Sequence, residues 1–84
     1  MNKGYVMDIH MSDIMLHIDE NLNLKEQSIL EKHMRDREGV IGLGYHSNQP
    51  HLMIVEFDQD VITPKELLNT ATNYGLHAEL VGLL

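Results

Sequence analysis

The sequence contains no cysteine, and it has six lysines and arginines against thirteen aspartates and glutamates. Without cysteine the chain has no disulfide, no thiolate metal site and no cysteine nucleophile. The formal net charge of −7 opposes nonspecific binding to phosphate backbones or anionic lipid. No apolar run approaches the roughly 20 residues of a membrane span, and the N-terminus shows no basic-then-apolar signal pattern. These absences predict a cytoplasmic protein with no membrane and no nucleic-acid partner.

The length of 84 residues allows one small domain. Leu, Ile, Val and Phe together exceed the roughly 20% below which chains tend to stay disordered, so the chain is expected to fold. Residues 1–11 match no element and are predicted to be a flexible lead-in. Residues 12–84 are predicted to form the single domain.

A repeat divides this domain into two halves. The segment 19–26 matches 58–66 with one extra residue in the second copy, and each copy lies between a strand-like run and a helix-like run. The resulting pattern predicts strands over 12–18, 40–45, 52–57 and 78–81, one helix over 24–37, and a second helix that begins at Thr63 and stops at Gly75. Two β-α-β halves indicate an α+β, ferredoxin-like β-α-β-β-α-β sandwich: a four-stranded antiparallel sheet of order 4-1-3-2 with two helices on one face.

The apolar positions of these elements predict one core between sheet and helices. We expect it to contain a leucine or valine from most elements: Leu16, Leu30, Val55, Leu67 and Leu80. His33 lies on or near the inner stripe of the first helix and is expected to be a partly buried structural residue.

Several local patterns carry a resemblance to a known family. They are Ile18-Asp19, Glu38-Gly39-Val40, Phe57-Asp58-Gln59 and Tyr74-Gly75 followed by Ala78-Glu79-Leu80-Val81. Over about residues 13 to 82, this sequence resembles the heavy-metal-associated domains of copper chaperones, mercury-binding proteins and metal-pumping ATPases. The resemblance implies a ferredoxin-like, non-enzymatic binding module.

The metal motif of that family is missing from this sequence. In the family, the loop after the first strand carries Met-x-Cys-x-x-Cys, whose thiolates hold a soft ion. Aligning the helix starts places Asn21 at the Met position, with Asn23 and Glu26 at the two Cys positions. Because copper(I) gains little from amide or carboxylate oxygen, the chain cannot bind it as the family does. Asn23 and Glu26 are expected to cap the helix instead.

Four histidines offer a different ligand set. His17 ends the first strand, His46 ends the second, and His51 and His77 open the third and fourth, so the topology gathers all four near one edge of the sheet. Imidazole suits zinc, nickel and copper(II), and a carboxylate such as Asp19 would complete a site. Strand parity separates them, however: His17 and His77 face the open side, whereas His51 points toward the helices. The alternative is that these are scattered surface histidines without a shared role.

A second ligand set lies near the N-terminus. Met7, His10, Met11 and Met15 together provide thioethers and imidazole, which suit a soft metal ion. The alternative is that methionines gather here for no functional reason.

Enzymatic and RNA-binding functions do not fit the residue types. Acylphosphatases share the topology but need an arginine in the loop after the first strand, which here reads Asp19-Glu20-Asn21, and no serine or threonine stands in a recognisable nucleophile arrangement. RNA recognition on this fold needs aromatic residues on the outward positions of strands one and three. Those positions hold Met15, His17, Leu52, Ile54 and Glu56.

The open face of the sheet combines apolar and polar residues. Parity gathers an apolar patch of Met15, Leu52, Ile54 and Val81 on it, and such patches usually mark contact surfaces. Four interpretations of the patch stay open: contact with a second copy in a homodimer, contact with a protein partner, cover by the segment Tyr5–Met11 folded back, or exposure without any partner. Two function classes therefore remain. One is a metal-binding module using histidine, with zinc, nickel or copper(II); the other is a protein-interaction or homodimerisation module that has lost metal binding.

Overall fold

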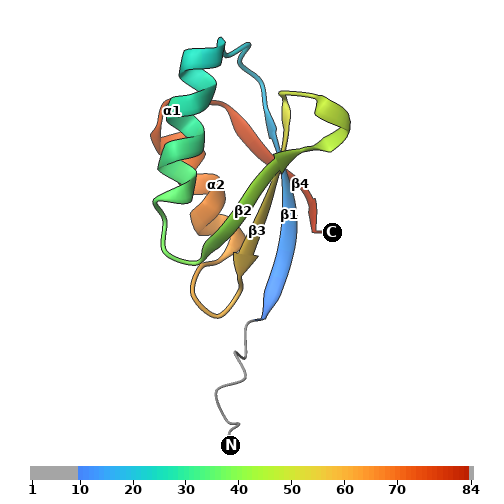
Figure 1. Cartoon of the computed structure of the whole chain (residues 1–84), viewed down its shortest axis with the longest axis vertical. Coiled ribbons are helices and arrows are strands. Elements are labelled where there is room, and N and C mark those ends of the chain that lie inside the picture. Colours follow the sequence, from blue (N-terminus) through green and yellow to red (C-terminus); the bar gives the residue numbers. More distant parts are fainter. Residues whose placement is uncertain (1–9, 84) are drawn as a thin grey trace, which may run out of the picture.

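The computed structural model describes the backbone of residues 10–83 and the side chains of residues 10–82. The elements run β1 (Met11–Ile18), α1 (Leu24–Arg35), β2 (Val40–Tyr45), the 3₁₀ turn η1 (His46–Asn48), β3 (Leu52–Asp58), α2 (Pro64–Asn73) and β4 (Ala78–Leu83). The four strands form one sheet of order β2-β3-β1-β4, in which every neighbouring pair is antiparallel. Both helices cover the same face of it (Figure 1). This confirms the predicted α+β ferredoxin-like sandwich with strand order 4-1-3-2.

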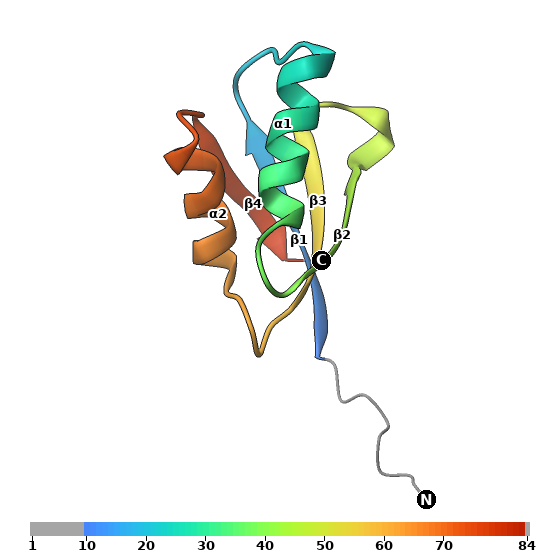
Figure 2. The ribbon, with the colours of Figure 1, turned by 60° about the vertical axis from the view of Figure 1, so that its left-hand side comes forward.

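Strand β1 shows why the sheet has two different faces. Ile14, Leu16 and Ile18 are at most 2% exposed, and side chains in a strand point to alternate faces. Their neighbours Met15 and His17 therefore lie on the face without helices. Figure 2 shows both helices in front of one side of the sheet, with the other side uncovered.

Both helices begin with the same device. In α1 the Asn23 side chain accepts from the Glu26 backbone N–H at 2.8 Å, and the Glu26 carboxylate accepts from the Asn23 N–H at 3.0 Å. In α2 Thr63 and Glu66 make the equivalent pair at 3.1 and 3.0 Å. Each capping box satisfies backbone donors that the first turn leaves without partners. The asparagine cap is therefore structural, as predicted for the positions where the family carries cysteine.

The core lies between the helices and the covered face of the sheet. It consists of Ile14, Leu16, Ile18, Leu30, Met34, Met53, Val55, Phe57, Ile62, Leu67 and Ala71. Two sequence predictions about it were wrong. Leu80 is 42% exposed, because β4 is an edge strand and has no neighbour on its outer side. His33 is exposed, with its ring 4.7 Å from that of Tyr74, so it lies between the helices at the surface.

The pairing of β1 with β4 contains a bulge. Leu16 lies opposite Leu80 and Met15 lies opposite Gly82, so Val81 is the extra residue. A bulge shifts the alternation of the bulged strand by one residue. Gly82, rather than Val81, therefore stands beside Met15 on the open face, while Val81 remains 55% exposed. Of the segment Tyr5–Met11, one of the predicted covers for this face, residues 5–9 lie outside the described residues and Met11 begins β1.

No helix within residues 10–83 is long and apolar enough to cross a membrane.

Strand β1 begins at Met11, one residue earlier than the sequence pattern indicated, and α1 ends at Arg35, two residues earlier than predicted. The glycine after α1, Gly39, has a φ of +98°, which allows the chain to turn into β2.

Candidate metal site

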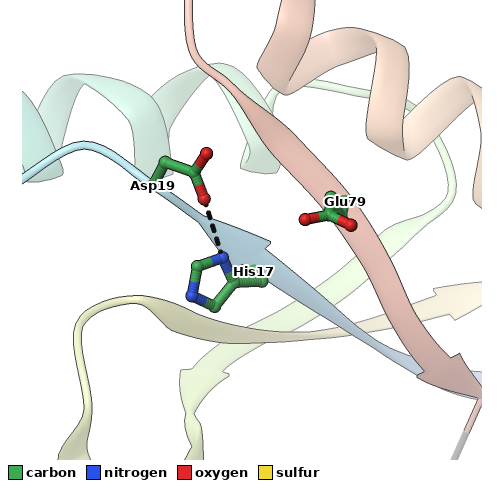
Figure 3. A group of neighbouring side chains, drawn as sticks. All are labelled: His17, Asp19 and Glu79. Atoms are coloured by element: carbon green, nitrogen blue, oxygen red, sulfur yellow. Dashed lines mark ion pairs between the residues drawn. The ribbon is translucent and has the colours of Figure 1, made fainter.

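Three potential metal ligands gather where β1 ends. One ligand atom each from His17, Asp19 and Glu79 lies within 4.8 Å of the other two. Among residues 10–82 this is the one group of three or more histidine or acidic side chains that meets that spacing. Figure 3 shows His17 and Asp19 joined at the end of β1, with Glu79 on the adjacent β4.

The sheet register positions this cluster. His17 lies directly opposite Glu79 in the β1–β4 ladder, so both side chains project from the same face of neighbouring strands. Asp19 follows two residues after His17, and its Oδ1 lies 3.1 Å from His17 Nδ1. The side chains of His17 and Asp19 are 40% and 58% exposed, so the cluster is open to solvent ions.

His77, which the sequence analysis placed beside His17 as a ligand, does not belong to the cluster and pairs with Glu20. Its Nδ1 lies 2.7 Å from Glu20 Oε2, and its backbone N–H donates to both oxygens of the same carboxylate at 2.9 and 3.0 Å. The hydrogen bond to His77 lowers the pKa of Glu20, and the same bond raises the pKa of His77. The negative charge of Asp19 also contributes to the raised pKa of His77. The Asp19 backbone N–H donates to the His77 carbonyl at 2.9 Å, which holds the two residues close together. This Glu20–His77 pair ties the chain before α1 to the chain before β4, beside the ligand cluster.

The other two predicted histidines do not join the cluster. The His51 ring stacks on that of His17, with centroids 6.0 Å apart, and does not point toward the helices. Its Nδ1 lies 2.6 Å from the Ile18 carbonyl oxygen, and its Nε2 lies 3.0 Å from Asn21 Oδ1. Both ring nitrogens of His51 are therefore engaged by groups outside the cluster. His46 begins η1 and is exposed.

The N-terminal ligand set is only partly within the described residues. Met7 lies outside them. His10 pairs with Asp60, with 2.7 Å between Nδ1 and Oδ2, and Met11 is 57% exposed at the start of β1. Since His10 precedes β1 and His17 stands near its other end, these two histidines lie at opposite ends of the strand.

Comparisons with known proteins bear on the fold. No protein-family model matches the sequence, and no curated relative matches it. Solved structures do match. The N-terminal domain of a potential copper-translocating P-type ATPase from Bacillus subtilis, in its Cu(I)-loaded state, is 16% identical, covers 88% of this chain and 91% of that one, and has a TM-score of 0.76. A copper binding domain from another P-type ATPase is 15% identical, with 86% and 96% covered and a TM-score of 0.76.

Oxidized MerP from Ralstonia metallidurans CH34 is 14% identical, covers 86% of this chain and 99% of that one, and has a TM-score of 0.74. The chain has the fold of a heavy-metal-associated domain. The matching structures confirm the resemblance in fold that was drawn from the sequence. The sequence has no cysteine and therefore lacks the paired-cysteine motif.

The sequence pointed to His17 and Asp19 as ligands but not to Glu79, and it did not indicate that Glu20 pairs with His77. Parity placed Glu79 on the open face with His17, and the antiparallel pairing of strands one and four was predicted. The sequence therefore indicated the face and the neighbouring strand of Glu79, but not that Glu79 lies directly opposite His17. Glu20 lies in a loop, where no periodicity indicates the direction of a side chain.

Proposed function

We propose that this domain is a non-enzymatic module that binds a divalent metal ion through His17, Asp19 and Glu79. The observation that supports the proposal is the mutual approach of three ligand atoms within 4.8 Å. Ligand atoms about 2.0–2.2 Å from a tetrahedral zinc ion lie roughly 3.4 Å apart. The three side chains lie at the surface and not in the core. Side-chain rotations that displace each ligand atom by about 1 Å would therefore bring the three atoms to the spacing that an ion requires.

The donor set determines which ions fit. One imidazole and two carboxylates suit zinc, nickel or copper(II), whereas copper(I) prefers thiolate or thioether ligands. Three protein ligands leave at least one coordination position for water or for a ligand from another molecule, as in zinc sites that exchange ligands. The proposed cargo is therefore a borderline divalent ion held in an exchangeable way.

Calorimetric titration with zinc, nickel and copper(II) chlorides tests the proposal, with histidine NMR signals recorded in parallel. We expect one ion per chain and a change of the His17 signals with at least one of the three metals. His17→Asn and Glu79→Gln should each weaken binding by at least about tenfold. Mutating a residue that only orients a metal ligand already costs about 10–100-fold in affinity, so loss of a ligand should cost no less. Binding should weaken at acidic pH, because imidazole must be neutral to coordinate.

His46→Asn is the matched control, because it removes an exposed histidine that lies outside the cluster. It should leave affinity within about twofold of the original. Equal losses in the His17 and His46 variants, or no binding of any of the three ions, would contradict the proposal. So would copper(I) binding stronger than that of all three divalent ions.

A further inference from the structure

On the open face of the sheet, residues of neighbouring strands lie opposite one another in rows that cross the strands. The central row reads Gly44, Ile54, Met15 and Gly82 from β2 to β4. A Cβ added at Gly44 or at Gly82 would meet no atom within 4 Å. Ile54 and Met15 therefore form a low apolar ridge with bare backbone on both sides, which another chain can approach closely.

An acidic row lies beside this ridge. Asp13 is directly opposite Glu56 in the β1–β3 ladder, and both alternate with buried residues, so both project from the open face. The Glu56 carboxylate extends over Gly42, where a Cβ would stand 2.6 Å from its Oε1. Like charges directly opposite each other on neighbouring strands are destabilising. The face therefore retains an arrangement that costs stability in the isolated chain.

The positive charges of the described chain lie on the other side. Lys25, Lys32 and Arg35 belong to α1, Arg37 follows it, and Lys65 belongs to α2. None of the four strands contains lysine or arginine. The apolar ridge is thus flanked by carboxylates on both sides: Asp13 and Glu56 at one end, and Asp19 and Glu79 at the other. No lysine or arginine of the four strands lies among them.

This segregation decides which occupant the face fits. A second copy placed face to face would bring acidic side chains against acidic side chains, which disfavours association. A partner with cationic side chains would satisfy the Asp13–Glu56 pair and cover the ridge at the same time. Rows two residues apart along a strand are about 7 Å apart, which sets the spacing such a partner must match.

We propose that the open face docks a partner protein that places an apolar side chain against Met15 and Ile54, and a lysine or arginine about 7 Å away against Asp13 and Glu56. The surface does not depend on the metal cluster. It uses a different part of the same face.

Selection of peptides from a random dodecapeptide phage library, with the full chain as bait, tests the proposal. We expect selected peptides to combine apolar residues with lysine or arginine. The leading peptide, once synthesised, should shift the NMR signals of Met15 and Ile54, and its affinity should fall with rising salt. Replacing its basic residues with glutamate should abolish binding.

Two variants of equal charge locate the contact. Asp13→Asn with Glu56→Gln should weaken the peptide by about tenfold or more, because it removes the complementary charges. Asp36→Asn with Glu38→Gln makes the same change of net charge after α1 and should alter affinity less than twofold. Ile54→Ala should weaken binding without changing the salt dependence.

The proposal would be overturned if the selection enriched no peptide, or only peptides without basic residues. Equal losses of peptide affinity in the two double variants, or NMR shifts on the helices, would also overturn it. A different occupant of the face would do the same. The last would appear as a dimer in sedimentation that dissociates in Ile54→Ala, or as NMR contacts from Met15 and Ile54 to residues 1–9.

Discussion

The two faces of this sheet are made by the same strands and have opposite character. On β1, Ile14 and Leu16 are fully buried against the helices, while the intervening Asp13, Met15 and His17 face away from them. The buried core residues of the covered face are all apolar, whereas the open face holds carboxylates, histidine and a low apolar ridge. The comparison indicates that one face stabilises the fold, while the other holds the ionisable side chains of the candidate site.

The largest effects should come from the covered face. Leu30→Ala removes a side chain that is 1% exposed and should lower the free energy of unfolding by about 2–4 kcal/mol, through lost burial and a residual cavity. Leu80→Ala, on the 42% exposed edge position, should cost about half of that or less. Urea unfolding followed by circular dichroism measures both. Equal losses at the two leucines would show that β4 is packed more tightly than its exposure indicates.

The second comparison uses glycines. Gly39 has a φ of +98°, and a Cβ there would stand 2.8 Å from Ile62 Cγ2. Gly39→Ala should therefore cost about 1–3 kcal/mol, from backbone strain and from displacement of the core side chain. Gly44→Ala places its methyl group in open space on the uncovered face and should change stability by less than about 0.5 kcal/mol. Thermal unfolding of the two variants is sufficient, and a costly Gly44→Ala would mean that something covers the open face.

Most of the fold was predictable because its signals are local and agree with one another. Alternation in 12–18, the Asn23–Glu26 and Thr63–Glu66 spacings and the repeat each indicate the same topology, and consistency across levels is what specifies a fold. The errors came from positions that local patterns do not determine. Leu80 follows the strand alternation, yet its exposure depends on whether another strand lies beyond it. His33 follows the helical stripe, yet it stands where that stripe meets the surface.

The candidate site was less predictable because its geometry depends on register and loops. The topology gathered the histidines at one edge, but a position one residue away along a strand changes the face. The bulge beside Val81 shows this, since it exchanges Val81 for Gly82 next to Met15. His51 shows it as well, because its ring lies beside His17 through hydrogen bonds to Ile18 and Asn21 that no periodicity indicates.

The third prediction concerns the acidic row of the open face. Asp13→Asn removes one of two like charges that lie directly opposite each other and should raise the free energy of unfolding by about 0.2–1 kcal/mol. The gain should shrink as salt is added, because the Debye length falls to about 8 Å at physiological ionic strength. Urea unfolding at low and high salt measures it. A loss of stability would indicate that the Asp13 carboxylate already has a favourable contact and would weaken the case for a cationic partner.

The smallest effect should be the pH dependence of the Glu20–His77 pair, since the His77 side chain is 81% exposed and exposed pairs are screened by solvent. The raised pKa of His77 gives stability that is complete below its usual value of about 6.5 and is lost as pH rises through the raised pKa. The lowered pKa of Glu20 gives stability that is complete above its usual value and is lost as pH falls through the lowered pKa.

Stability from this pair is therefore greatest in the acid range, where Glu20 is already ionised and His77 is still protonated. His77→Asn should cost most at about pH 5–6.5 and progressively less toward alkaline pH, as measured by melting temperature across a pH series. His46→Asn removes an exposed imidazole away from the pair and should leave the difference flat. A His77→Asn deficit that grows toward alkaline pH would mean that neutral His77 is the form that stabilises this edge. In that case the two side chains would be joined by a hydrogen bond from the neutral imidazole to the Glu20 carboxylate, and not by an ion pair.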